Sequence, residues 1–150
     1  MNKALLIAFL TFTIVCTAQE VEYKVITSVE SIVPGGIGRS RIISEQEDEV
    51  DYEAYTTERT DGKKSDQGKV KRGDIKIENF EETKLLNFYS LTGINFQNIA
   101  SNDAVISNKI NSLAEKGWEL AFVTSGAEAD AGKGDGTGIF ITRYVFKRRK

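Results

Sequence analysis

Carboxylates at a spacing of two residues form the most regular chemical pattern in this 150-residue chain. The side chains of Glu45, Glu47, Glu49, Asp51 and Glu53 would share one face of an extended backbone. Carboxylates on one face repel each other unless a cation binds them, and calcium is the hard cation that prefers such oxygen ligands. The pattern predicts either a solvated acidic segment or a calcium site that includes Glu47, Glu49 and Asp51. The solvated segment is favoured because the spacing and the glycine of an EF-hand are missing.

A glycine-rich segment at 126–138 carries Asp130 and Asp135, which are the other candidate calcium ligands. Its glycines alternate and precede a predicted strand. The segment therefore matches neither a P-loop, which needs Gly-Lys at a fixed spacing followed by Ser or Thr, nor a dinucleotide-binding turn, which opens a helix. A flexible connection between two strands is the favoured interpretation, and no cofactor other than calcium is expected.

Two arginines, Arg39 and Arg41, follow a glycine-rich turn and would project to one side of an extended segment. Such a pair is a candidate clamp for an anion. Ion pairing with the acidic run a few residues further on is the favoured alternative. The basic end of the chain, 147–150, is expected to be a solvated terminus. With a net charge of -2, the chain has no electrostatic footprint for nucleic acid.

The first residues have the pattern of a secretory signal. Lys3 precedes an uncharged apolar stretch, and small residues at Cys16 and Ala18 predict cleavage after Ala18. The stretch is shorter than the roughly 20 apolar residues of a membrane span. A lipid anchor on Cys16 is disfavoured because Val15, which is not a small residue, precedes it. We therefore expect an exported protein, periplasmic or secreted, that does not span the membrane after cleavage.

Removal of 18 residues would leave 132 residues with no cysteine, methionine or histidine, because the chain has no histidine and its single cysteine and methionine lie in the leader. The mature chain would then have no disulfide, no catalytic triad with histidine, no cysteine nucleophile and no zinc or blue-copper site of the common kinds. Its side-chain chemistry would be confined to carboxylates, hydroxyls, lysines, arginines and tyrosines.

Residue periodicity predicts the elements that would position these groups. Alternating β-branched residues predict a strand over 21–29, and a shorter extended segment follows at 39–44. Residues 45–74 form a polar insertion, in which Tyr52, Ala54 and Thr56 hint at a strand and a hairpin or a flexible loop fits equally. Apolar residues between 75 and 91 indicate further strand.

The clearest helix begins near residues 101–103 and carries an apolar stripe through Leu113. Gly117 fits a left-handed cap at its end, and Trp118 would fill the core at the corner between helix and strand. Further strands are expected over 118–123 and 139–147. These elements predict an α+β fold: an antiparallel sheet of four or five strands with one main helix packed on one face, as a single domain over 19–150.

Three short motifs resemble a known family. They are Glu22-Tyr23-Lys24-Val25 in the first strand, Gly117-Trp118-Glu119-Leu120 after the helix, and Phe146-Lys147-Arg148 near the end. The chain resembles the small bacterial family numbered 4177 among the domains of unknown function, over residues 21–29 and 103–148. The resemblance implies a compact strand-and-helix domain and structural roles for Gly117 and Trp118. It implies no activity, and it does not cover the insertion from 32 to 100.

Three functions remain open from the sequence. The favoured one is an exported, non-enzymatic binding or interaction module of the bacterial envelope, with an unidentified protein or glycan as its partner. The rival is a carboxylate-dependent hydrolase of envelope glycans or other polymers, which would need a concave cleft that holds two acids. The third is an envelope protein that calcium stabilises.

Overall fold

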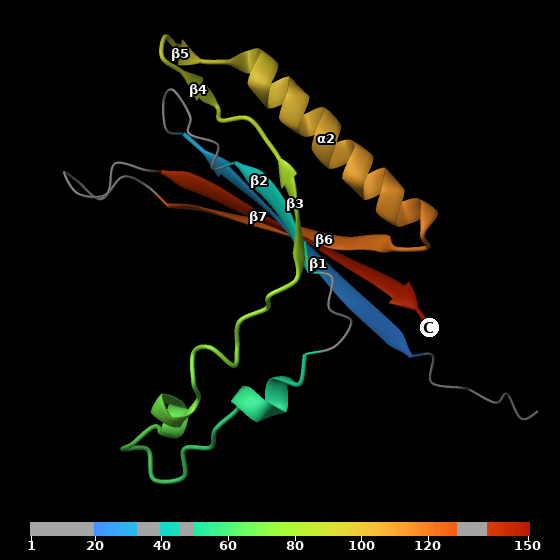
Figure 1. The fold of residues 1–150 in the computed structure, drawn as a ribbon. Coiled ribbons are helices and arrows are strands. Elements are labelled where there is room, and N and C mark those ends of the chain that lie inside the picture. The colour runs from blue at the N-terminus through green and yellow to red at the C-terminus, as the bar shows by residue number, and fades with distance from the viewer. Residues whose placement is uncertain (1–19, 33–39, 46–49, 129–137) are drawn as a thin grey trace, which may run out of the picture.

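The computed structural model describes residues 20–32, 40–45, 50–128 and 138–150, except for the side chain of Glu45. Its main feature is a five-stranded antiparallel sheet with the strand order β3-β2-β1-β7-β6 (Figure 1). The strands are β1 (Val21–Ser31), β2 (Arg41–Glu45), β3 (Phe80–Lys84), β6 (Glu119–Glu128) and β7 (Ile139–Arg149). The predicted α+β class and the antiparallel sheet are confirmed.

One long helix, α2 (Phe96–Glu115), lies along one face of this sheet (Figure 1). It packs on a core of seven buried apolar side chains that come from both layers: Ile26, Ile42, Leu85, Ile106, Leu113, Trp118 and Phe146. On the opposite face, the side chains of Val25, Thr27 and Ile43 are only half-buried, and they line a hollow of about 240 Å³. The sheet therefore has one covered and one open face.

The helix begins earlier than the sequence indicated. Asn95 is its N-cap, and the Asn95 Oδ1 atom accepts hydrogen bonds from the backbone N–H groups of Gln97 (3.1 Å) and Asn98 (3.2 Å). The predicted start near 101–103 was wrong because the first turn of the helix is largely polar or exposed. In addition, the core-facing position in the second turn holds Asn102, which interrupts the apolar stripe.

The connection between β3 and α2 is clamped by polar side chains. Asn102 is 1% exposed; its Oδ1 atom accepts from the Leu86 N–H (2.8 Å), and its Nδ2 atom donates to the Leu86 carbonyl (2.7 Å). Ser40 Oγ donates to Asn87 Oδ1 at 2.7 Å from the sheet side. Asn102 of the helix and Ser40, which directly precedes β2, thus hold residues 85–88 between the two layers, although the sequence predicted strand there.

Residues 50–79 form an arm that extends away from the sheet (Figure 1). The arm contains two short 3-10 helices, η1 (Tyr52–Tyr55) and η2 (Asp66–Lys69), and has no buried residue. The strand hinted at by Tyr52, Ala54 and Thr56 is wrong, because Tyr52 and Ala54 lie in η1 and Thr56 is the C-cap of that helix. The polar composition of the arm explains this: it offers too few apolar side chains to pack a strand against the sheet.

A small second sheet precedes α2. It consists of β4 (Tyr89–Ser90) and β5 (Gly93–Ile94), which pair around a tight turn. The last strands are longer than predicted, because β6 continues to Glu128 and β7 continues to Arg149. The basic end of the chain is therefore mostly strand, in which Lys147 and Arg148 are half-buried, while Arg149 and Lys150 are exposed as expected for a solvated terminus. In the described part of the chain, no helix combines the length and the apolar character that a membrane crossing requires.

Candidate functional site

The acidic residues that the sequence suggested for calcium are only partly visible in the structure. Glu47, Glu49, Asp130 and Asp135 lie outside the described residues. Asp51 is the N-cap of η1, where its Oδ1 atom accepts from the Glu53 N–H at 3.0 Å. Asp51 therefore caps a helix and does not belong to an extended strand of aligned carboxylates. Among the described residues, no group of three acidic, histidine or cysteine side chains is arranged to hold a metal ion.

Of the two arginines proposed to bind an anion, Arg41 is described and Arg39 is not. The guanidinium of Arg41 forms an ion pair with Glu82, which lies on the neighbouring strand β3. Pairing with a carboxylate was the favoured expectation, and this partner comes from β3; most of the acidic run lies outside the described residues. Arg41 also lines a hollow of about 320 Å³ together with Ser40, Glu82 and Lys84.

The turn from α2 into β6 has the predicted structure. Gly117 has a φ of 83°, the left-handed conformation that glycine adopts without strain. The N–H of Gly117 donates to the Ala114 carbonyl (2.9 Å), and the N–H of Trp118 donates to the Leu113 carbonyl (3.0 Å). These two bonds fix the direction in which the chain leaves the helix. As a result, Trp118 enters the core and is only 8% exposed.

A polar cleft of about 330 Å³ surrounds the exposed edge of this tryptophan, and we call it the Trp118 cleft. It is built from strands β1, β2, β3 and β7 and the last turns of α2, and its lining includes Lys24, Lys109, Lys116, Arg148, Glu22, Glu81, Ser44 and Trp118. A neighbouring hollow of about 570 Å³ shares Arg148 and adds Lys147, Arg149 and Glu119. The two cavities meet where the C-terminal end of α2 lies over the sheet.

Arg148 organises the cleft through several contacts. Its Nε atom donates to Glu22 Oε1 at 2.6 Å, and its Nη1 atom donates to the backbone carbonyl of Lys116 at 3.2 Å. Its guanidinium carbon lies 4.4 Å from the centre of the Trp118 ring, and the ammonium of Lys24 lies 5.8 Å from the same centre. Both distances are in the range of cation–π contact. Arg148 and Lys24 are therefore held beside the tryptophan ring by these contacts.

The charges of the two cavities do not balance. The three acids of their linings each form an ion pair: Glu81 with Lys109 (3.0 Å), Glu119 with Lys147 (3.6 Å) and Glu22 with Arg148 (2.6 Å). Three other lining cations, Lys24, Lys116 and Arg149, have no carboxylate within 4.0 Å in the part of the chain that the structure describes. A chain with a net charge of -2 thus has a local excess of positive charge here.

Glu30 is a carboxylate that the sequence did not single out. Burial raises the pKa of Glu30 above its ordinary value, and the charge of Asp103 adds to this, while a hydrogen bond from Asn102 opposes it. The Asn102 Nδ2 atom donates to Glu30 Oε1 at 2.9 Å. Glu30 lines neither the Trp118 cleft nor the neighbouring hollow. Its environment is set by the contact between helix and sheet.

Sequence reasoning found Gly117 and Trp118 but missed the cations that surround them. Lys24 and Arg148 were noticed only as parts of motifs, and Lys116 was not named as a site residue. A usable signal was present, because each of the three lies within two residues of a motif that resembles family 4177. No family model, curated protein or solved structure matches the chain, so the resemblance stays a prediction.

Proposed function

We propose that this chain is an exported, non-enzymatic binding module of the bacterial envelope, and that its ligand binds in the Trp118 cleft. The observation that carries the proposal is the state of the charged groups in the cleft. Both lining acids, Glu22 and Glu81, are ion-paired, while Lys24 and Lys116 have no carboxylate partner among the described residues. The cleft therefore presents to a ligand two ammonium groups that no described carboxylate neutralises.

Acid–base hydrolysis needs a different arrangement. Glycoside hydrolysis requires two carboxyl groups about 5 to 9.5 Å apart, one of which carries a proton. In the Trp118 cleft, both lining acids are engaged in ion pairs, Glu22 with Arg148 and Glu81 with Lys109, so neither carboxyl group is free to act on a substrate. This argument supports binding over catalysis at this position.

A carboxylate-dependent hydrolase remains the alternative, and Glu30 is the observation that favours it. Its raised pKa is the property of a general acid, and Asp103 is a second carboxylate close enough to contribute to the shift. A hydrolase would bind its polymer beside Glu30, and the Glu30→Gln variant would lose turnover. A binding module would show no turnover in either form.

Trp118 provides the test, because it is the single tryptophan of the chain and lies in the cleft. The purified protein is titrated with chitotetraose, a neutral envelope-type glycan, with inorganic phosphate and with polyglutamate, while tryptophan emission is recorded. We expect a saturable emission change with at least one probe, and no new reducing ends from the glycan. Turnover that Glu30→Gln abolishes would replace the proposal with the hydrolase, and unchanged emission with all three probes would contradict it.

A further inference from the structure

We propose that the Trp118 cleft binds a phosphomonoester group through Lys24 and Lys116; this inference rests on the proposed function and names the ligand chemistry of the same site. The two lysines come from different layers, Lys24 from β1 and Lys116 from the C-cap of α2, yet they line one cavity. A ligand that contacts both ammonium groups would bridge the sheet and the end of the helix.

Charge matching favours phosphate over a single carboxylate. The lining of the Trp118 cleft holds four cations and two acids, which leaves two positive charges after Lys109 and Arg148 have paired with Glu81 and Glu22. A phosphomonoester carries a charge of about -1.5 to -2 at pH 7 and has three acceptor oxygens. A carboxylate brings one negative charge and would leave one of the two lysines uncompensated.

The surroundings of Trp118 disfavour a neutral sugar. Sugar-binding clefts commonly stack the ring of the ligand on an open aromatic face, but Trp118 is 8% exposed and has Arg148 and Lys24 over its ring at 4.4 and 5.8 Å. No open tryptophan face is left for stacking. Recognition in this cleft therefore depends on charge and hydrogen bonding.

Arg148 adds a pre-positioned donor. Its Nε and Nη1 atoms already bond Glu22 and the Lys116 carbonyl, which locks the plane of the guanidinium, and among the described residues no acceptor bonds its Nη2 atom. A guanidinium held in this way loses little conformational entropy when it binds a phosphate oxygen. The cavity volume of about 330 Å³ is within the range of small-molecule sites, so a sugar phosphate would fit.

The experiment compares glucose 6-phosphate, glucuronate and glucose, which share a sugar ring and differ in charge. Trp118 emission reports binding of each to the full chain. We expect glucose 6-phosphate to bind at least tenfold more tightly than glucuronate, and its affinity to fall as potassium chloride is added, because mobile ions screen the lysines. Inorganic phosphate and vesicles of phosphatidylcholine, with and without phosphatidic acid, then distinguish a soluble phosphate from a lipid headgroup as the source.

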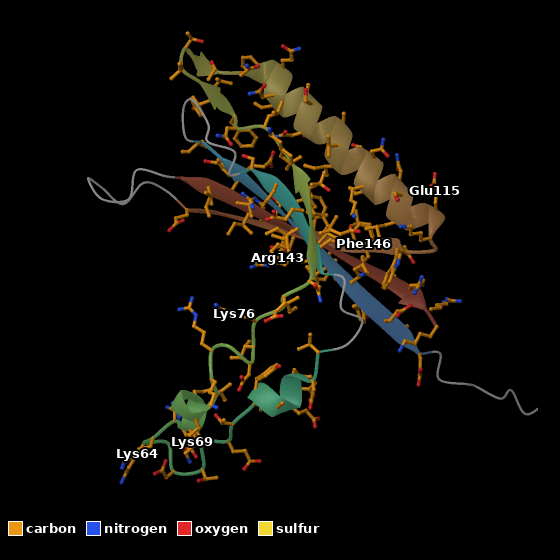
Figure 2. The ribbon with its side chains drawn as sticks, in the orientation of Figure 1. Lys64, Lys69, Lys76, Glu115, Arg143 and Phe146 are labelled. Carbon is orange, nitrogen blue, oxygen red and sulfur yellow. The ribbon has the colours of Figure 1, made fainter. Side chains whose placement is uncertain are left out.

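Two variants localise the site. Lys24→Gln and Lys116→Gln should each weaken glucose 6-phosphate binding about fivefold to tenfold, since each removes one charge-assisted hydrogen bond. Lys64→Gln is the matched control, because Lys64 lies on the arm, far from the cleft (Figure 2). The affinity of this variant for glucose 6-phosphate should equal that of the wild type. Thermal unfolding of the three variants, compared with the wild type, checks that each is folded.

The outcomes separate the two proposals. If glucose binds as tightly as glucose 6-phosphate, or if the Lys24 and Lys116 variants bind like Lys64→Gln, the phosphate inference is overturned while the binding module stands. If no phosphate-bearing probe binds but glucuronate or polyglutamate does, the ligand is a carboxylate and the inference is again overturned. If no probe changes Trp118 emission, both proposals fail.

Discussion

The amide of Asn102 is the contact whose removal should most clearly show how α2 is held to the sheet. The side chain is 1% exposed and bonds both backbone groups of Leu86, at 2.8 and 2.7 Å, and also the carboxylate of Glu30, at 2.9 Å. Asn102→Ala leaves the N–H and the C=O of Leu86 without these partners. Each unsatisfied group costs about 1 to 3 kcal/mol when fully buried.

The net change is smaller than that sum for two reasons. Leu86 is 39% exposed, so water replaces part of the lost hydrogen bonding. Alanine also has a better helix propensity than asparagine by about 0.5 kcal/mol. We expect Asn102→Ala to lower the free energy of unfolding by about 2 kcal/mol, which corresponds to a Tm decrease of roughly 4 to 8 °C for a chain of this size. Chemical denaturation and calorimetry measure the two quantities.

Asn108 provides the matched control. It lies on the same helix, is exposed, and is replaced by the same residue, so Asn108→Ala should be neutral or slightly stabilising. Hydrogen exchange supplies a local readout. The exchange rate of the Leu86 amide should rise strongly in Asn102→Ala and should stay at the wild-type value in Asn108→Ala. Equal stability of the two alanine variants, or an unchanged Leu86 exchange rate, would refute this account of the clamp.

Asn102→Asp extends the same reasoning to pH. The new carboxylate still accepts from the Leu86 N–H but places an oxygen against the Leu86 carbonyl and Glu30, where Asn102 had donated. The pKa of the new carboxyl should therefore be raised in the folded protein, which then binds more protons than the unfolded chain. Its stability should increase as the pH falls toward the ordinary pKa of an aspartate, more steeply than that of the wild type.

Three further predictions concern other features of the fold. Gly117→Ala should lower the free energy of unfolding, measured by denaturant, by about 1 to 2 kcal/mol, because Gly117 has a positive φ of 83°. Gly126→Ala is the control and should lower it by almost nothing, since Gly126 has no positive φ and has open space where a Cβ would lie. The pKa of Glu30 is raised by burial, so Glu30→Gln should be more stable than the wild type at neutral pH, and a pH series should show this advantage disappearing below about pH 4.5. Replacing residues 46–79 by Asn-Gly should leave the sheet folded and raise Tm. The arm contributes no buried side chain, and closing the shorter loop costs about 2 kcal/mol less free energy. A loss of dispersed amide NMR signals in the shortened protein would contradict this prediction.

Local patterns in the sequence predicted several elements correctly. Alternating β-branched residues identified β1 and β7, because the two faces of a strand alternate along the chain. Gly117 and Trp118 were also identified correctly, since a helix end and the strand that follows depend on neighbouring residues. The α+β class followed from adding these elements together.

Contacts between distant residues were not predictable in the same way. The start of α2 was missed because Asn102 faces the core, and its polarity is explained only by the backbone of Leu86 and by Glu30, which lie elsewhere in the sequence. The arm was read partly as strand because short alternation does not show whether a sheet edge is available to it. The last strand was predicted too short because the charges of Arg148 and Arg149 concealed their pairing with β1.

The amino-acid sequence alone determined which side chains this protein can use: many carboxylates, hydroxyls and basic groups, no histidine and a single tryptophan. Composition and short-range periodicity can be read without knowing which residues meet in space. Only the tertiary structure decided where these groups meet. The register between β1 and β7 brings Glu22 opposite Arg148, and the end of α2 adds Lys116 to the same cleft. Strand register and helix docking are set by packing energies summed over the whole core, and no local segment contains that sum.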